Sequence, residues 1–326
     1  MTALLPRDVR DVFARFITTE FATLDTRGRP IVWPLTPYYT DGAPAIEVST
    51  GVGYPKKAED ARRNPHVAML FSDPTGSGLE TAKRVLVQGT AEIDDADLAA
   101  NRERYRRESA RKLPATREMM PPRILEGLFG WYFERIYIRV RPERVFVWEG
   151  GDFAAEPVLL DSHMEEVRSG HSEEPDEPHP APSPEPVAWD RRIEELGSRH
   201  PSAVLAWEAP DGFPLAVRVS PAPDRSKGRI GVGRDPAGLP LAEGPACLVA
   251  HSHGPDFRWQ ENFQVRGDLV REGGDWALIP HRLVGGFELP RESRLAGMRR
   301  NFSKSIRFYR TRKRVLRERQ ARAAAG

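Results

Sequence analysis

The first half of the chain alternates short apolar runs with turn-forming residues, a pattern typical of strands joined by hairpins. An Asp-Thr-Arg-Gly turn separates two apolar runs within residues 21–39, and together they predict a β-hairpin. Four more strands are predicted over residues 43–50, 65–72, 84–93 and 135–150. Residues 94–113 are highly charged and begin with acids, which predicts a helix. This half is therefore expected to be mainly β, with flanking helices.

The second half repeats this order of elements in a less regular form. An Asp-Gly turn within residues 202–221 stands where the first hairpin has its turn, and runs at 228–233, 244–254 and 263–270 follow the earlier strand order. Gly267 lies inside its strand at the place that Gly89 occupies in the first copy, which is the most specific of these matches. We expect two tandem copies of one small β-barrel.

Composition divides the chain further. Residues 161–186 hold 8 acids and 1 arginine and are rich in Pro, Ser and His, so they cannot bury enough apolar surface to order themselves. We interpret 161–187 as an acidic linker between a first domain over 1–160 and a second over 188–290. The tail, 291–326, carries 13 Lys or Arg against 2 Glu.

The tail also has apolar residues at helical spacing, which predicts a basic amphipathic helix. The residues of this apolar stripe are Leu295, Met298, Phe302, Ile306, Tyr309 and Leu316. Three roles are open for the helix. It packs on a barrel, it binds an anionic partner such as nucleic acid or a membrane surface, or it closes on the acidic linker.

Several classes of protein and site are not indicated. No window approaches the run of about 20 apolar residues that spans a bilayer, and the opening residues lack an apolar secretory segment, so a cytoplasmic location is expected. Cys247 is the only cysteine, which excludes a disulfide within the chain. His251 and His253 share one strand face but have no third ligand nearby in the sequence, so no metal site is predicted. No catalytic triad or carboxylate pair stands out.

The stretch Ser49–Phe71, STGVGYPKKAEDARRNPHVAMLF, carries the candidate chemistry. Pro55 is expected as the first helical residue, and Asn64-Pro65 is expected to end the helix. A helix N-terminus with flanking lysines attracts phosphate, so Lys56 and Lys57 are candidate phosphate ligands, with Ser49 and Thr50 as hydroxyl donors. The alternative is that the two lysines are a solvated helix start.

The order of these segments over residues 16–149 resembles the flavin-binding split β-barrel family of pyridoxamine 5'-phosphate oxidase, which includes deazaflavin-dependent reductases. Residues 188–290 resemble it more faintly, as a degenerate second copy. The resemblance implies that Thr50, Lys56 and Lys57 hold the phosphate of FMN or of a deazaflavin coenzyme. Trp33, in the strand expected to line the flavin, is the best candidate for stacking on its ring.

The chain departs from the family in ways that shape the prediction. Trp33 replaces an arginine of pyridoxamine phosphate oxidases, and their C-terminal substrate pattern is absent, so that activity is not expected. The family's glutamine that reaches into the partner's flavin site is Arg84 in the first copy and Asn262 in the second. Family members dimerise, and the second copy lacks the lysine pair. A monomeric pseudo-dimer, or a homodimer, with one cofactor per chain and Asn262 reaching across is therefore expected.

The function expected from the resemblance is an oxidoreductase that uses FMN or a deazaflavin on a small-molecule substrate, with no protein acid or base named as catalytic. The alternative is a non-catalytic cofactor-binding or interaction protein, in which the second copy has closed the site and the basic tail carries the function.

Overall fold

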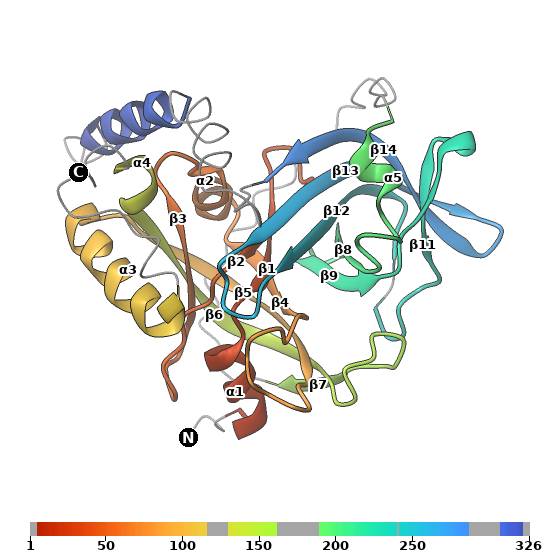
Figure 1. Ribbon diagram of the computed structural model, residues 1–326, viewed down its shortest axis with the longest axis horizontal. Coiled ribbons are helices and arrows are strands. Elements are labelled where there is room, and N and C mark those ends of the chain that lie inside the picture. Colours follow the sequence, from red (N-terminus) through yellow and green to blue (C-terminus); the bar gives the residue numbers. More distant parts are fainter. Residues whose placement is uncertain (1–4, 116–129, 162–188, 240, 287–306, 322–326) are drawn as a thin grey trace.

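The computed structural model describes residues 5–115, 130–161, 189–239, 241–286 and 307–321, which form two antiparallel sheets with flanking helices (Figure 1). The first sheet has the order β2-β1-β4-β5-β6-β3, and β7 pairs with β6. Its strands are β1 (Thr19–Leu24), β2 (Pro30–Leu35), β3 (Ile46–Gly51), β4 (His66–Phe71), β5 (Arg84–Asp94), β6 (Arg135–Trp148) and β7 (Val158–Asp161). All strands predicted for the first half are present.

The second sheet has the order β9-β8-β12-β13-β14-β11-β10. Its strands are β8 (Ala203–Glu208), β9 (Pro214–Val219), β10 (Ala222–Asp224), β11 (Arg229–Gly233), β12 (Gly244–His253), β13 (Gln260–Glu272) and β14 (Asp275–Gly285). Apart from β7 and β10, the order matches the first sheet strand for strand, which confirms the mainly β fold and the repeat. The described strands of each sheet form an open path and do not close into a full barrel.

The two matched glycines occupy the same local structure in both sheets. Gly89 lies opposite Pro142 and Gly267 opposite Pro280, each beside a shift in strand register. A Cβ at Gly89 would lie 2.0 Å from the carbonyl oxygen before Pro142, and a Cβ at Gly267 would lie 1.9 Å from the carbonyl oxygen before Pro280. Because the backbones approach so closely, only glycine fits at either position.

The two sheets pack against each other in a reciprocal way. β2 of the first sheet contacts β12 and β13, while its counterpart β9 contacts β4 and β5, as in a dimer with a two-fold axis. One apolar core contains buried residues of both sheets. Across this interface the Nε2 of Gln88 donates a hydrogen bond to the carbonyl oxygen of Pro214 at 2.9 Å, and the Nε2 of Gln264 donates to that of Val32.

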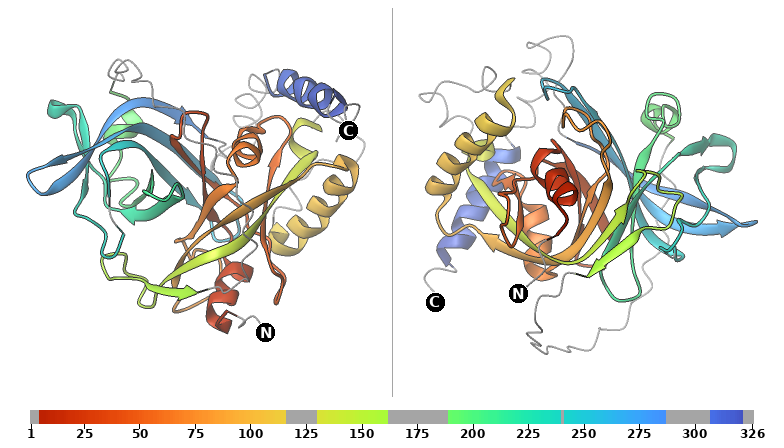
Figure 2. Two further views of the ribbon diagram at one scale, coloured as in Figure 1. Left: turned by 180° about the vertical axis from the view of Figure 1, so that it is seen from behind. Right: turned by 90° about the horizontal axis from the view of Figure 1, so that it is seen from below.

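Short helices cover the sheets. They are α1 (Arg7–Arg15), α2 (Lys56–Arg63), α3 (Leu98–Lys112), α4 (Gly130–Phe133) and α5 (Arg191–Glu194), together with the 3-10 turn η3 (Arg225–Lys227). Residues of α1 and α2 enter the core of the first sheet, which curves around α1 in the right view of Figure 2.

Two predicted helix starts were wrong, one by a single residue and the other by four residues. α2 begins at Lys56, and Pro55 stands just before it as the N-cap. α3 begins at Leu98 and not at residue 94, because β5 continues to Asp94 and the side chain of Asp97 accepts hydrogen bonds from two N–H groups of the first turn.

A C-terminal helix over residues 307–321 packs on the first sheet near α4 (Figure 1). Val315 belongs to the core of that sheet, and Arg312 donates to Glu134 at 2.6 Å. Tyr309, expected in the apolar stripe, is 37% exposed, so that part of the prediction was wrong. The neighbouring Phe308 packs inward, on Trp131. The rest of the stripe up to Ile306 lies outside the described residues.

The predicted acidic linker also lies outside the described residues, so the domain boundaries around it stay predictions. Within the described ranges, no helix is long and apolar enough to cross a membrane. The same part of the chain holds no group of three or more His, Cys, Asp or Glu side chains suited to a metal ion. Cys247 is buried, and burial raises the pKa of its thiol to about 11.

Candidate functional site

The end of β3 and the start of α2 bring together most of the residues predicted to hold a phosphate. Thr50 is fully buried, and its hydroxyl donates to the carbonyl oxygen of Tyr54 at 3.0 Å. Ser49 is also buried and lies opposite Tyr137 of β6. Lys56 forms an ion pair with Asp60, one turn along α2, at 2.9 Å. Lys56 therefore already has an anionic partner within the protein.

Lys57 has a different environment from its neighbour. Its Nζ lies 5.7 Å from the centre of the Trp33 ring and 5.5 Å from that of Tyr54, within the range of cation–π attraction. Burial of the ammonium group, and then the nearby charge of Arg135, lower the pKa of Lys57 to about 8. Among the described residues Lys57 forms no ion pair with a carboxylate, although the charge of Asp60, which pairs with Lys56 and Arg63, acts to raise its pKa.

Arg135 is a further candidate residue of this site, and the sequence analysis did not predict it. It begins β6, opposite Gly51, and is only 5% exposed. Its guanidinium carbon lies 3.8 Å from the ring centre of Tyr105 and 4.3 Å from that of Tyr132. Its Nε is buried and has no hydrogen-bond partner among the described residues, where no carboxylate pairs with it either.

Arg135 is the first residue of β6, whose side chains alternate between the two faces of the sheet. It is buried because α3 and α4 cover the face on which it lies, and no spacing in the sequence signalled this.

The glycine loop between β3 and α2 is covered by protein. The N–H of Val52 donates to the carbonyl oxygen of Glu134 at 3.0 Å, and that of Gly53 donates to the carbonyl oxygen of Trp131 at 2.9 Å. A Cβ at Gly53 would lie 3.0 Å from side-chain atoms of both Trp131 and Phe308. A phosphate at this site would therefore be held by side chains, since these loop amides are already engaged.

A fit to a phosphorylated cofactor can be tested on these contacts. Lys57 and Arg135 together offer two adjacent cations, one of them with an unpartnered buried nitrogen, which suits an anion. Trp33 lies beside Lys57 and could face a bound ring. The side chains at the end of β3 therefore fit a phosphate, whereas the loop backbone contributes little.

Arg84 and Asn262 were predicted to reach a cofactor from the two copies of the repeat. Arg84 begins β5 and lines a cavity of about 400 Å³ together with Arg218 and His251. Asn262 is buried on β13, where His251 is its partner in strand register. Each residue stands five positions before the matched glycine of its copy, and the predicted contacts of both with a cofactor stay predictions.

A charged cluster joins the two sheets next to this cavity. Glu20 of β1 is 0% exposed, and its Oε1 accepts from the hydroxyl of Ser72 at 2.8 Å and from Nη2 of Arg218 at 3.1 Å. The Nε2 of His251 lies 2.6 Å from the same oxygen. Nearby, the Nε2 of His253 lies 3.2 Å from the hydroxyl of Thr18, so the two histidines contact different partners.

No protein-family model matches the chain, and no curated protein is similar enough to match it. Several solved structures are similar to roughly half of it. A putative pyridoxamine 5'-phosphate oxidase from Listeria innocua is 14% identical over 43% of this chain and 95% of its own, with a TM-score of 0.31. An F420 reductase is 19% identical over 43% of this chain and 98% of its own, with a TM-score of 0.33. A FAD-binding protein from Mesorhizobium loti is 20% identical over 44% and 94%, with a TM-score of 0.30.

Proposed function

We propose that the protein binds a phosphorylated flavin-type cofactor, FMN or a deazaflavin coenzyme, and acts as an oxidoreductase on a small molecule. The observation that carries the proposal is the adjacent pair Lys57 and Arg135. Arg135 is buried and Lys57 is partly buried, and neither forms an ion pair with a carboxylate of the described residues, although the charge of Asp60 acts on Lys57. A buried charge is costly unless an opposite charge lies beside it. A cofactor phosphate bound between Lys57 and Arg135 would supply that opposite charge.

The chain's own residues would bind and orient the cofactor. Lys57 and Arg135 would hold the phosphate, and Trp33 would cover one face of the ring and exclude water from it. The flavin would supply the transfer of hydride or electrons to the substrate. The second copy has no lysine pair where the first has Lys56 and Lys57, so we expect one cofactor per chain, in a monomeric pseudo-dimer.

A second candidate is a non-catalytic binding or interaction protein, and the covered glycine loop favours it. Phe308 and Trp131 lie stacked at 4.8 Å directly over Gly53, and the loop amides already have partners. In this case the C-terminal helix would keep the site closed permanently.

The test is to purify the protein, record its absorbance and identify any bound small molecule by mass spectrometry. Stripped protein is then titrated with FMN and with a deazaflavin coenzyme, and binding is followed by fluorescence. Lys57→Ala should weaken binding by about 1.5–3 kcal/mol, the scale of a charge-assisted contact. Lys227→Ala, which changes an exposed lysine paired with Asp224 in the second copy, is the matched control.

Bound or titratable flavin whose affinity falls in Lys57→Ala alone supports the proposal. Absence of binding to both cofactors, together with no chromophore in the purified protein, favours the non-catalytic alternative. Equal affinity in Lys57→Ala and the parent would remove Lys57 from the site.

A further inference from the structure

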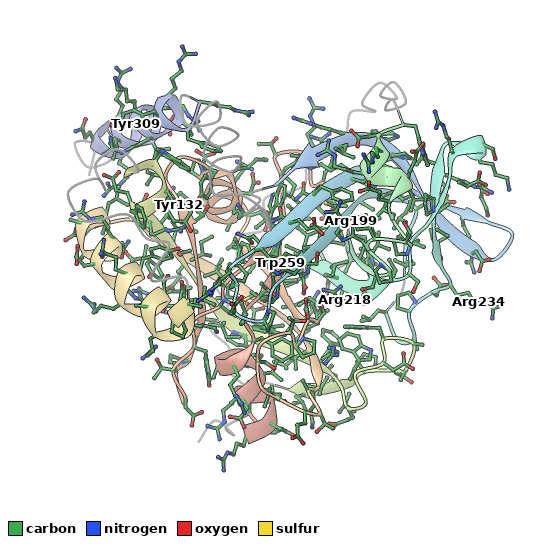
Figure 3. The ribbon with its side chains drawn as sticks, in the orientation of Figure 1. Tyr132, Arg199, Arg218, Arg234, Trp259 and Tyr309 are labelled. Atoms are coloured by element: carbon green, nitrogen blue, oxygen red, sulfur yellow. The ribbon has the colours of Figure 1, made fainter. Side chains whose placement is uncertain are left out.

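The cavity between the two sheets is built by both copies of the repeat. It has a volume of about 400 Å³, within the range of small-molecule sites. Arg84 reaches it from the start of β5, Arg218 from β9 and Arg199 from the segment before β8. Figure 3 shows Arg199 and Arg218 among the side chains of the second sheet, with Arg234 far from them at the outer edge. Three guanidinium groups from separate segments thus converge on one cavity.

Two of these three cations are neutralised by the protein. Arg218 pairs with the buried Glu20 at 3.1 Å. Arg199 pairs with Glu261 and lies 3.4 Å from Glu195. The charges of Arg199 and Arg218 are therefore already balanced by carboxylates of the protein.

Arg84 is the exception among the cations of the cavity. Its Nη1 donates to the carbonyl oxygen of Ala82 at 2.6 Å, and no carboxylate of the described residues pairs with it. Burial, and then the nearby charge of Arg218, lower the pKa of Arg84 below its ordinary value. Asp73 also lines the cavity, and its carboxylate accepts the N–H of Thr75 at 3.0 Å. The charges of Asp73 and Glu20 act on Arg84 without forming an ion pair with it, so a ligand anion would supply the direct partner that the described residues lack.

The rest of the lining suits an organic anion with an apolar body. The ring of Phe153 forms one wall and is held by Trp148, with ring centres 4.8 Å apart. The hydroxyls of Ser72 and Ser202 line another side, where both accept hydrogen bonds from Arg218. A guanidinium group matches the planar, two-oxygen geometry of a carboxylate.

We propose that this cavity binds a small organic carboxylate, with the carboxylate on Arg84 and the apolar part of the molecule against Phe153. The cavity lining includes neither Lys57 nor Arg135, so this site and the proposed cofactor site can be tested separately. The proposed carboxylate site therefore lies where the two copies of the repeat meet.

Calorimetric titration of the full-length protein tests the proposal with three probes. Benzoate supplies a carboxylate on an apolar ring, benzamide is its neutral counterpart, and inorganic phosphate is a tetrahedral anion. We expect benzoate to bind and benzamide not to bind. Arg84→Gln should weaken benzoate binding at least about tenfold, the loss expected for one charge-assisted contact. Arg234→Gln, at an arginine with a 90% exposed side chain, should leave it unchanged.

Arg84→Lys guards against a variant that fails to fold. It keeps the charge but loses the two-pronged guanidinium, so benzoate should bind it more weakly than the parent. Equal binding of benzoate to the parent, Arg84→Gln and Arg84→Lys would overturn the proposal, as would equal binding of benzamide. Phosphate binding that depends on Arg84, without benzoate binding, would also overturn the assignment to a carboxylate.

Discussion

Glu20 is the position at which the joint between the two copies is most sensitive to a single change. Glu20→Gln keeps the shape of the side chain but removes the charge that faces Arg218 at 3.1 Å. Removing one partner of a buried ion pair costs about 3–5 kcal/mol, because the other charge stays buried without compensation. The side chain of Arg218 is 15% exposed, so water can partly solvate its charge once the carboxylate is removed. We expect a cost near the low end, about 3 kcal/mol.

The assay is urea denaturation of the parent and the variant at pH 7, with the free energy of unfolding as the readout. Glu92→Gln is the matched control, since its pair with Arg141 at 2.9 Å has side chains 51% and 53% exposed. Surface pairs of this kind contribute about 0–1 kcal/mol. A cost below about 1 kcal/mol for Glu20→Gln, or a cost no larger than that of Glu92→Gln, would refute the reasoning.

The pH dependence gives the same prediction a second readout. Burial acts to raise the pKa of Glu20, but His251, Arg218 and Ser72 outweigh it, and the pKa lies below its ordinary value of 4.5. A carboxyl with a lowered pKa in the folded state contributes stability that is fully present above the ordinary value. That contribution is lost as the pH falls through the lowered value. The parent should therefore lose stability in acid more steeply than Glu20→Gln.

Three further predictions concern the repeat, the C-terminal helix and the lysine site. Gly89→Ala and Gly267→Ala should each lower the free energy of unfolding by about 1–3 kcal/mol, because the added Cβ clashes with the backbone. Gly150→Ala is the control, since a Cβ there would have no atom within 4 Å and should cause no such loss. Thermal denaturation of the three variants measures the difference. In urea denaturation, Phe308→Ala should destabilise the protein by about 2 kcal/mol, whereas Tyr309→Ala should have almost no effect. If the C-terminal helix serves packing, neither variant should change the affinity of the protein for an oligonucleotide. Lys57→Met should reduce the rise in stability between pH 8 and 10.5, because an amine whose pKa is about 8 when folded binds more protons unfolded. Equal slopes in parent and variant would contradict it.

Much of the fold could be predicted because it depends on local patterns. Apolar runs, turn residues and the matched pair Gly89 and Gly267 were enough to place the strands and the repeat. The charged joint was harder, because Glu20 and Arg218 are 198 residues apart in sequence. An acid within the apolar strand β1 was the available signal for a buried partner.

The lysine site shows a different limit. The position of Lys57 at the start of a helix followed from Pro55 and the preceding strand. The burial of Arg135 and the covering of Gly53 did not, because they depend on α4 and on a helix that begins more than 250 residues further along the chain than the glycine loop. Packing between segments far apart in the sequence decides which polar groups of a site remain free to bind a ligand. The spacing of residues along the chain does not predict that packing.

The internal repeat explains how one side of the joint can carry charges that the other side lacks. The hairpins β1–β2 and β8–β9 share the same register, so Glu20 corresponds to Val204 and Arg218 to Pro34. In a two-fold homodimer every residue occurs twice, and a glutamate at the first position would meet the partner's proline and remain unpaired. A tandem chain lets the two copies differ, so a buried pair can form once. The same freedom permits Lys57 in one copy only, which is why one cofactor and one carboxylate per chain are expected.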